Sequence, residues 1–486
     1  MTELPTELTR DCLPSMHTPY PLAQALLDRH LTRDGYTTAI WSDQQQTWWA
    51  YNNGIWEDQG PRYMLRTLPE ILQTSTYLHD NEIKGFNPKP HQVKNLAEIL
   101  ADKTSGILST TAATITLQPG APAELLERLP HLVPFKNGLL DYSTGDLLSH
   151  SPAVFNTYQL PYNYDAAAEC PQWQKFLDDV FAHDPAAIAA LQEFFGYVLS
   201  GRTDLQKGFM LIGPPRSGKG TISHILQELV GAPGNVCTMQ LSSFKNTFAL
   251  AQAVGKPLMV LEDMRGNARS TEAAVLAMLS IIGGDSVEIN PKGKPQYATT
   301  LPCRVFAVSN ELPTLADSSA AAPNRFIYAE TYQGHLGKED TTLPARLATE
   351  LPGVFNWARE GIARLDRNLG RFTLPGTHPD MLEDMTELAS PITTFLRECF
   401  EITGNEDDHE LLVTVWKHYA KWCVDNGRNE GNQQSMSKAI NAAALPGVKS
   451  INTWRKDTDT PRTKKHRIVR GLLLVEEDTG GWAIGA

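Results

Sequence analysis

The chain of 486 residues is long enough for roughly two to four domains, and its 41% hydrophobic and 20% charged residues indicate a globular protein with sizeable cores. A formal net charge of −12 excludes a uniformly basic surface, so any contact with DNA must be local. There is no run of about 18 apolar residues and no signal peptide, and the six cysteines are scattered without a C-x-x-C pair. We therefore expect a soluble, cytoplasmic protein with no membrane partner, zinc site or disulfide framework.

The N-terminal 200 residues mix helical patterns with short strands. Residues 1–20 are polar and contain proline, so we expect a loose arm, and the apolar spacing over 22–27 predicts a helix. The aromatic residues of 40–56 predict a hairpin of two short strands around Asn53-Gly54. Their tryptophans could stack nucleic-acid bases, but filling a small core is the commoner use and the one we expect.

Helical patterns dominate the rest of this N-terminal part. A helical stretch follows to about Lys103, and the segment Pro134–Asp141 predicts a strand with a turn. Pro171–Ser200 predicts two helices that pack before the next strand. The first carries Trp173, Phe176, Leu177 and Val180 on its apolar face, and the second carries Leu191, Phe194, Phe195, Val198 and Leu199.

The segment Gly208–Leu229 carries the strongest motif. An apolar run over 209–212 predicts a buried parallel strand, and apolar residues at helical spacing begin at Ile222. The loop between them has the strand–loop–helix setting of a phosphate-binding loop. Its residues are Gly213, Pro214, Pro215, Arg216, Ser217, Gly218, Lys219, Gly220 and Thr221.

Each part of this loop has a physical role in binding a nucleoside triphosphate. Gly213 and Gly218 allow backbone N–H groups to converge on phosphate oxygens, and the helix N-terminus adds partial positive charge. Lys219 is expected to reach the β- and γ-phosphates. Because Gly220 stands where a serine or threonine is usual, we assign the hydroxyl for Mg²⁺ to Thr221. A glycine-rich turn before an ordinary helix is the alternative.

A second apolar strand, Pro257–Asp263, ends in the carboxylates of Glu262 and Asp263. The carboxyl ends of parallel strands are where open α/β sheets bind ligands. One carboxylate can hold Mg²⁺ and the other can polarise an attacking water, and the sequence does not assign which does which. Alone, such a run is more often a strand that leaves the core. About 44 residues after Lys219, it fits the second half of an ATPase site.

Three further features follow the acidic strand. A helical stretch over 270–282 precedes a predicted hairpin, with strands at 287–290 and 295–299 and with Lys292 and Lys294 at its tip; a solvated turn is the common alternative. The strand Cys303–Val308 leads to Asn310, whose amide could orient the lytic water. Arg325 precedes another apolar strand and is either an arginine finger for a neighbouring subunit's nucleotide or a surface arginine.

The C-terminal part forms a separate unit. Residues 369–390 predict a turn-rich linker, and 391–486 a domain with helices near 391–400, 412–424 and 435–444. Between Lys449 and Arg470, eight Lys/Arg stand against two Asp. Three helices and a basic hairpin resemble a winged-helix module, in which basic residues contact DNA phosphates; a solvated hairpin is the alternative. The candidate contacts are Arg462, Lys464, Lys465 and Arg467.

The order of these motifs resembles that of the superfamily III helicases, and within them the poxvirus and satellite-phage primase-helicase branch. The resemblance covers most of the chain and rests on the set of motifs rather than on any one. The segments that look like the branch's helicase-associated domain are Asn137–Asp141, His150–Pro152, Trp173–Phe176 and Leu191–Tyr197. Those that match its core are Asn310–Pro313, Asp317, Arg325 and Leu351–Gly361.

The resemblance implies a multidomain α/β protein with three folded units. They are an N-terminal α+β helicase-associated domain (21–200), a central AAA+-like P-loop ATPase core (201–368) and a C-terminal winged-helix-like module. It also implies a ring, usually a hexamer, that hydrolyses ATP with Mg²⁺ at subunit interfaces and moves along single-stranded DNA at forks.

The resemblance also assigns roles to residues. Lys219 and Thr221 would contact phosphate and metal, and Glu262 and Asp263 would handle metal and water. Asn310 would sense the γ-phosphate, Arg325 would act in trans, and Lys292 and Lys294 would grip the DNA backbone. The family often has two consecutive arginines, and Asn324 replaces the first one here.

Many relatives also carry an N-terminal primase domain with clustered carboxylates and often a zinc site. No D-x-D pair or zinc spacing occurs in residues 1–20, so we expect a phage, satellite or plasmid helicase that works with a separate primase or host replication proteins. Two other functions stay open. One is an ATP-switched origin-binding initiator or scaffold. The other is a small-molecule kinase, suggested by Gly218–Thr221, although a kinase needs neither the lysine-tipped hairpin nor the C-terminal module.

Overall fold

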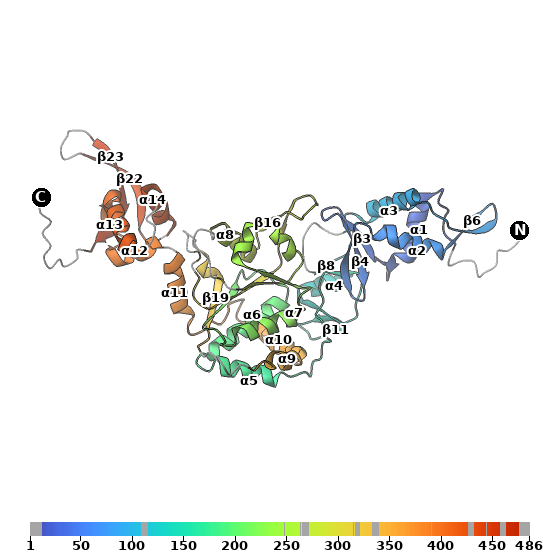
Figure 1. The fold of residues 1–486 in the computed structure, drawn as a ribbon, viewed down its shortest axis with the longest axis horizontal. Helices are drawn as coiled ribbons and strands as arrows, with labels where there is room; N and C mark the ends of the chain where they lie inside the picture. The colour runs from blue at the N-terminus through green and yellow to red at the C-terminus, as the bar shows by residue number, and fades with distance from the viewer. Residues whose placement is uncertain are drawn as a thin grey trace.

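The chain is elongated, with the N-terminal domain at one end, a parallel sheet in the middle and the C-terminal module at the other end (Figure 1). We describe a computed structural model of the protein. The described residues are 12–107, 115–246, 248–262, 264, 272–313, 315, 321–332, 340–389, 391–425, 432–443, 445–456 and 463–475.

The N-terminal domain packs helices against a small aromatic sheet. Its helices are α1 (Pro19–His30), α2 (Tyr63–Gln73) and α3 (Pro90–Thr104), and its main strands are β3 (Ala39–Ser42), β4 (Thr47–Asn52) and β5 (Ile55–Gly60). The short strands β1 (Thr32–Arg33) and β2 (Tyr36–Thr37) belong to the same domain, between α1 and β3. The predicted turn is confirmed, with Asn53 and Gly54 in the left-handed region at φ 47° and 90°. Trp48 and Trp56 are buried in hydrophobic cores, which confirms that the aromatics fill space.

Two features of this domain differ from the sequence-based expectation. The stretch predicted to be helical up to Lys103 contains a hairpin, β6 (Thr76–His79) and β7 (Glu82–Gly85), between α2 and α3. Asp80 and Asn81 form its turn with φ of 52° and 62°, a conformation that short polar side chains tolerate. Leu13 is buried and its N–H bonds the carbonyl of Thr76, so this part of the expected arm packs on the domain.

A connecting region of small sheets follows. Its elements are β8 (Ile115–Leu117), α4 (Ala123–Arg128), η2 (Leu129–His131), β9 (Leu132–Phe135), β10 (Gly138–Asp141), β11 (Leu147–Leu148) and β12 (Val154–Asn156). Next come two predicted helices, α5 (Pro171–Val180) and α6 (Pro185–Leu199). Phe135, Trp173 and Phe194 belong to the same hydrophobic core as strands of the central sheet, so this region and the sheet fold as one body.

The central sheet is parallel and has five strands. In spatial order they are β14 (Val236–Met239), β15 (Leu258–Glu262), β18 (Arg304–Ser309), β13 (Gly208–Ile212) and β19 (Phe326–Glu330). Alternate residues of β13 enter opposite cores, Phe209 and Leu211 on one face and Met210 and Ile212 on the other. A sheet covered on both faces explains why its strands are continuous apolar runs.

Helices and a hairpin surround this sheet. They are α7 (Lys219–Val230), η3 (Leu241–Lys245), η4 (Ala249–Ala253), α8 (Glu272–Gly283), the hairpin β16 (Ser286–Ile289) and β17 (Tyr297–Thr300), η6 (Pro323–Arg325), α9 (Leu343–Ala348) and α10 (Leu351–Arg367). Helix α10 packs along α6, where the fully buried carboxylate of Glu193 accepts hydrogen bonds from Arg364 Nε (2.6 Å) and from the N–H of Thr373 (2.7 Å). This contact fixes the segment that leaves α10.

The region predicted as a turn-rich linker contains a helix. Helix α11 (His378–Ala389) packs on the outer strand β19, where the N–H of Tyr328 donates to Nδ1 of His378 at 3.1 Å. The N–H of a strand at the edge of a sheet has no strand partner on its open side, and the imidazole supplies one here. Burial is the main cause that lowers the pKa of His378, with a smaller contribution from the charge of Lys207.

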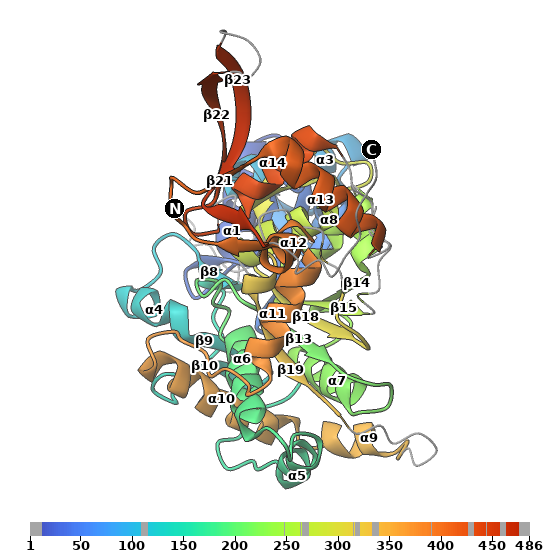
Figure 2. The ribbon, with the colours of Figure 1, turned by 90° about the vertical axis from the view of Figure 1, so that its left-hand side faces the viewer.

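The C-terminal module contains the three predicted helices and a long hairpin. Its elements are α12 (Pro391–Cys399), β20 (Phe400–Ile402), β21 (His409–Leu411), α13 (Leu412–Asp425), α14 (Gln433–Ala442), β22 (Lys449–Lys456), β23 (Thr463–Arg470) and β24 (Leu472–Leu474). The hairpin β22–β23 projects away from the helices (Figure 2). The helices and strands share a core that includes Phe395, Val415 and Val469.

Candidate phosphate-binding site

The loop between β13 and α7 is tightly folded at both of its glycines, Gly213 and Gly218. Gly213 has φ 149°, and a Cβ built there would lie 2.1 Å from the carbonyl oxygen of Thr331. Gly218, the residue before α7, has φ 93°, and its Cβ would lie 2.9 Å from Cγ2 of Val180. Arg216, in the exposed part of the loop, also has a positive φ of 63°. Two of these three positions therefore need glycine for space as well as for backbone angle.

Lys219 lies inside this loop. Only 4% of its surface is exposed, and Nζ donates to the carbonyls of Gly213 (2.6 Å) and Pro214 (2.7 Å). Burial lowers the pKa of the ammonium. Ser217 Oγ lies 2.6 Å from Thr331 Oγ1, which ties the loop to the end of β19. An anion placed in the loop would offer Lys219 charged oxygen partners in place of neutral carbonyls.

The strand order brings the other candidate residues to the same edge of the sheet. Strand β18 lies between β13 and β15, with Ser309 opposite Ile212 and Val308 opposite Glu262. Glu262 is exposed at the carboxyl end of β15, and Asn310, exposed directly after β18, lines the same cleft as the loop. This edge is where parallel α/β sheets bind ligands. Asp263 and Asp317 lie outside the described residues.

Oxygen ligands suited to a magnesium ion lie near the same edge. Thr221 is half-buried in the first turn of α7, and Glu262 is exposed at the end of β15. Hydroxyl and carboxylate oxygens are the ligands that Mg²⁺ takes, usually together with water and substrate phosphates. Both residues offer oxygens of the kind that Mg²⁺ takes, and their assignment to the metal stays a prediction.

A cleft of about 960 Å³ opens over the loop. It is lined by Pro215–Thr221 of the loop, by Val308 and Asn310, by residues of α5, and by the chain before α9 together with the start of that helix. Thr331, Asp179 and Asp340 were not foreseen from the sequence, because no short motif surrounds them. Hydrogen bonds from the side chain and N–H of Thr342, and from Arg346, lower the pKa of Asp340 to about 2.

Arg325 lies at the other end of the sheet. It immediately precedes β19, whose first residue Phe326 pairs with Gly208 at the start of β13. Its Nη1 donates to Oε1 of Gln206 at 2.6 Å. The phosphate loop follows the last residue of β13, so the fold does not bring Arg325 to the loop of its own chain.

The candidate DNA contacts lie on the two hairpins. The β16–β17 hairpin is found as predicted, with Gly293 at φ 75° in its turn, Lys292 exposed and Lys294 half-buried. Arg467 is exposed on β23. Lys464 and Lys465 belong to the same strand, but their side chains, like the whole of Arg462, are outside the described part of the chain.

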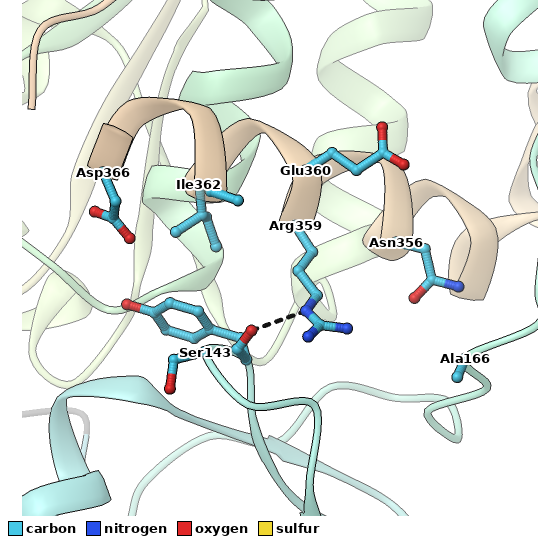
Figure 3. A pocket seen from close by; sticks show the side chains of 9 residues that line it. Ser143, Ala166, Asn356, Arg359, Glu360, Ile362 and Asp366 are labelled. Atoms are coloured by element: carbon cyan, nitrogen blue, oxygen red, sulfur yellow. Dashed lines mark hydrogen bonds between the residues drawn. The ribbon is translucent and has the colours of Figure 1, made fainter. Parts of the chain in front are cut away.

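A second cavity, of about 470 Å³, lies between α10 and the turn after β10 (Figure 3). Its arginine is already engaged, because Arg359 Nε donates to the carbonyl of Tyr142 at 2.8 Å and Nη1 donates to Tyr164 Oη at 3.3 Å. Glu360 and Asp366 add negative charge to the rim. The phosphate loop, with its helix N-terminus and lysine, is the better site for an anionic ligand.

Comparisons with known proteins relate two parts of the chain to two families. Residues 23–182 match the family described as D5 N terminal like, and residues 211–325 match a family of unknown function, DUF5906. The uncharacterized mitochondrial protein ymf21 of Marchantia polymorpha is 27% identical over 123 residues, which cover 23% of this chain and 68% of that protein.

Among solved structures, the chain is similar to the C-terminal region of NrS-1. One apo structure of that region (305–718) has a TM-score of 0.51 at 11% identity and covers 93% of this chain and 99% of that one. Another apo structure, the A form, has a TM-score of 0.45 at 10% identity and covers 89% and 95%. At such identity the first likeness shows a shared fold. In the described part of the chain, every helix is too short or too polar to span a bilayer.

Proposed function

We propose that this protein is an ATP-dependent DNA helicase that acts in the replication of a phage, satellite or plasmid-like element. The observation that carries the proposal is the strand order, which gathers Lys219, Glu262 and Asn310 at one edge of a parallel sheet. A switch that only binds nucleotide needs the loop, but it has no need of groups that position water. The D5-like match of residues 23–182 agrees with the resemblance to viral and phage primase-helicases.

In this proposal each residue at the edge has one task. Lys219 exchanges the carbonyls of Gly213 and Pro214 for oxygens of the β- and γ-phosphates. Asn310 orients the attacking water without adding charge, and Glu262, or Asp263 beside it, accepts a hydrogen bond from that water. Mg²⁺, held through Thr221 and one of these carboxylates, would supply positive charge against the phosphates.

Coupling to DNA uses the surfaces outside the cleft. Lys292 and Lys294 on the β16–β17 hairpin would contact the single-stranded backbone inside a ring, most simply a hexamer. Arg325 would complete the site of a neighbouring subunit. The order α12, β21, α13, α14, β22, β23 suits a winged-helix-like module with a basic hairpin as its wing. An acidic protein can still hold DNA this way, because only the surface that lines the central channel of the ring needs positive charge.

The first experiment measures ATP hydrolysis with and without single-stranded DNA, together with unwinding of a forked duplex. We expect DNA to stimulate hydrolysis in the wild type and in Lys94→Ala, a control that removes an exposed lysine of α3. The Lys292→Ala/Lys294→Ala variant should lose the stimulation but keep basal hydrolysis, because its cleft is intact. Lys219→Ala should abolish both hydrolysis and unwinding.

A second candidate is an ATP-switched initiator or scaffold that binds origin DNA without unwinding it. The β22–β23 hairpin, which is basic in sequence and projects from the module, favours this candidate, because such a hairpin can hold duplex DNA without a motor. The helicase would be contradicted, and the initiator supported, if DNA did not stimulate ATP hydrolysis and the protein bound duplex DNA tightly without unwinding it.

A further inference from the structure

The cleft over the phosphate loop extends beyond the space that phosphates would fill. Its volume of about 960 Å³ is near the upper end for small-molecule sites. Phe176 and Val180 of α5 line the part beyond the loop, and Leu343 and Pro344 at the start of α9 line it as well. A Cβ on Gly218 would lie 2.9 Å from Val180 and 3.3 Å from Phe176, so this apolar wall begins directly beside the loop.

The apolar residues of α5 differ in how deeply they are buried. Trp173 and Leu177 are fully buried in the core, whereas Phe176 and Val180 are half-buried: they pack against that core on one side and line the cleft on the other. Helices α5 and α9 also pack against each other, so the two apolar pairs lie on neighbouring elements. An apolar slot beside a phosphate loop suits the flat aromatic ring of a nucleotide, because stacking and apolar contact need no matching hydrogen bonds.

Two carboxylates lie at this part of the cleft, and their surroundings differ. Asp340 is engaged, since Oδ1 accepts from Thr342 and Oδ2 accepts from Arg346 at 2.9 Å. Asp179 is exposed and lines the cleft one helical turn after Phe176, and none of the described residues donates a hydrogen bond to it. An ionised carboxylate only accepts hydrogen bonds, so Asp179 can bind an amino group but repels a carbonyl oxygen.

We propose that α5 and the start of α9 form a nucleobase subsite that selects a purine with an exocyclic amino group. Phe176, Val180, Leu343 and Pro344 contact the ring, and Asp179 accepts a hydrogen bond from the amino group. The inference rests on the proposed nucleotide function of the loop and adds a preference among bases. Adenine carries the amino group at position 6 and guanine at position 2, and two ligand pairs distinguish them.

The test measures dissociation constants of the full chain by calorimetry with matched ligands. ATP is compared with purine riboside triphosphate, which lacks only the 6-amino group, and GTP is compared with inosine triphosphate, which lacks only the 2-amino group. In the wild type we expect the amino group to strengthen binding about tenfold to a hundredfold in at least one pair, as for one hydrogen bond to a charged group. The pair that responds identifies the base.

Three variants separate the base subsite from the phosphate loop. Asp179→Ala should bind the amino and amino-free ligands equally, whereas Asp178→Ala, which removes the neighbouring exposed charge, should keep the wild-type difference. Inorganic tripolyphosphate should bind Asp179→Ala as it binds the wild type and should fail to bind Lys219→Ala. Equal affinity within both ligand pairs in the wild type would overturn the subsite, and failure of wild-type binding to tripolyphosphate and ATP would instead overturn the nucleotide function.

Discussion

Replacing Gly213 with alanine perturbs the phosphate loop at its most crowded point. The new methyl group would lie 2.1 Å from the carbonyl oxygen and 2.3 Å from Oγ1 of Thr331, a fully buried residue that directly follows β19. The backbone at φ 149° is also unfavourable for a residue with a Cβ. Either the loop or Thr331 must move, and Thr331 is held by hydrogen bonds to Ile212 and Ser217.

The size of the effect on ATP binding follows from the backbone strain and from the steric overlap with Thr331. A backbone strain of this kind costs about 1–3 kcal/mol. Overpacking against a well-packed neighbour costs about another 1–3 kcal/mol. If the loop relieves the strain by moving, nucleotide binding must restore the strained conformation, so affinity should fall at least about 30-fold, the equivalent of about 2 kcal/mol.

Gly220→Ala is the matched control for this substitution. A Cβ on Gly220 would meet no atom within 4 Å, and the residue lies in the first turn of α7. Alanine there should leave stability unchanged or raise it by up to about 1 kcal/mol. Calorimetric titration with ATP and thermal unfolding measure both variants. A folded Gly213→Ala protein that binds ATP within about threefold of the wild type would refute the argument from close approach.

Two further predictions concern the core and pH. Glu193→Ala removes the buried partner of Arg364 and should destabilise the central body by about 3–5 kcal/mol. Asp366→Asn, which removes the charge of a half-exposed ion pair, should lower the free energy of unfolding by at most about 1 kcal/mol. If the two variants lowered the thermal unfolding temperature equally, this difference between the buried and the half-exposed pair would be contradicted. His378 accepts from Tyr328 only when its Nδ1 is unprotonated, and burial lowers its pKa, so its contribution is complete above the unfolded pKa of about 6.5 and is lost as pH falls below that value. Urea unfolding measured at several pH values should show the free energy of unfolding of the wild type falling as pH drops below about 6.5. The fall should be smaller in His378→Asn, and an equal fall in both proteins would contradict this role of His378.

The sequence predicted the parts of the site that local patterns determine. The apolar run before Gly213 and the helical spacing from Ile222 identify a strand and a helix, and both are present as β13 and α7. The two helices of 171–200 and the lysine-tipped hairpin are also confirmed. In each case the residues that determine the element lie close together in the sequence, so a short window contains the pattern that predicts the helix or strand.

The parts that the sequence did not predict depend on contacts between distant residues. Thr331 closes the phosphate loop, yet it lies more than 100 residues beyond Gly213 and is linked to it only because β13 and β19 pair. Phe176 was placed on the apolar face of its helix, and it does pack against the core, but it also lines the cleft. Periodicity identifies an apolar face but does not show that a cleft lies beside it. Helix α11 was missed because the glycines and prolines before it suggested a linker.

The position of Arg325 leads to a prediction about assembly. Because it precedes β19 at the opposite end of the sheet from the loop, it can act on ATP only in the site of another subunit. Arg325→Ala and Lys219→Ala should each be inactive alone, since every site lacks either the arginine or the loop lysine. Mixed one to one with subunit exchange, they should recover hydrolysis, because about one quarter of interfaces in a ring then combine an intact lysine with an intact arginine. The double variant mixed with Arg325→Ala forms no complete interface and is the control. Full activity of Arg325→Ala alone, or a mixture as inactive as the control, would show that Arg325 has no role in the neighbouring site.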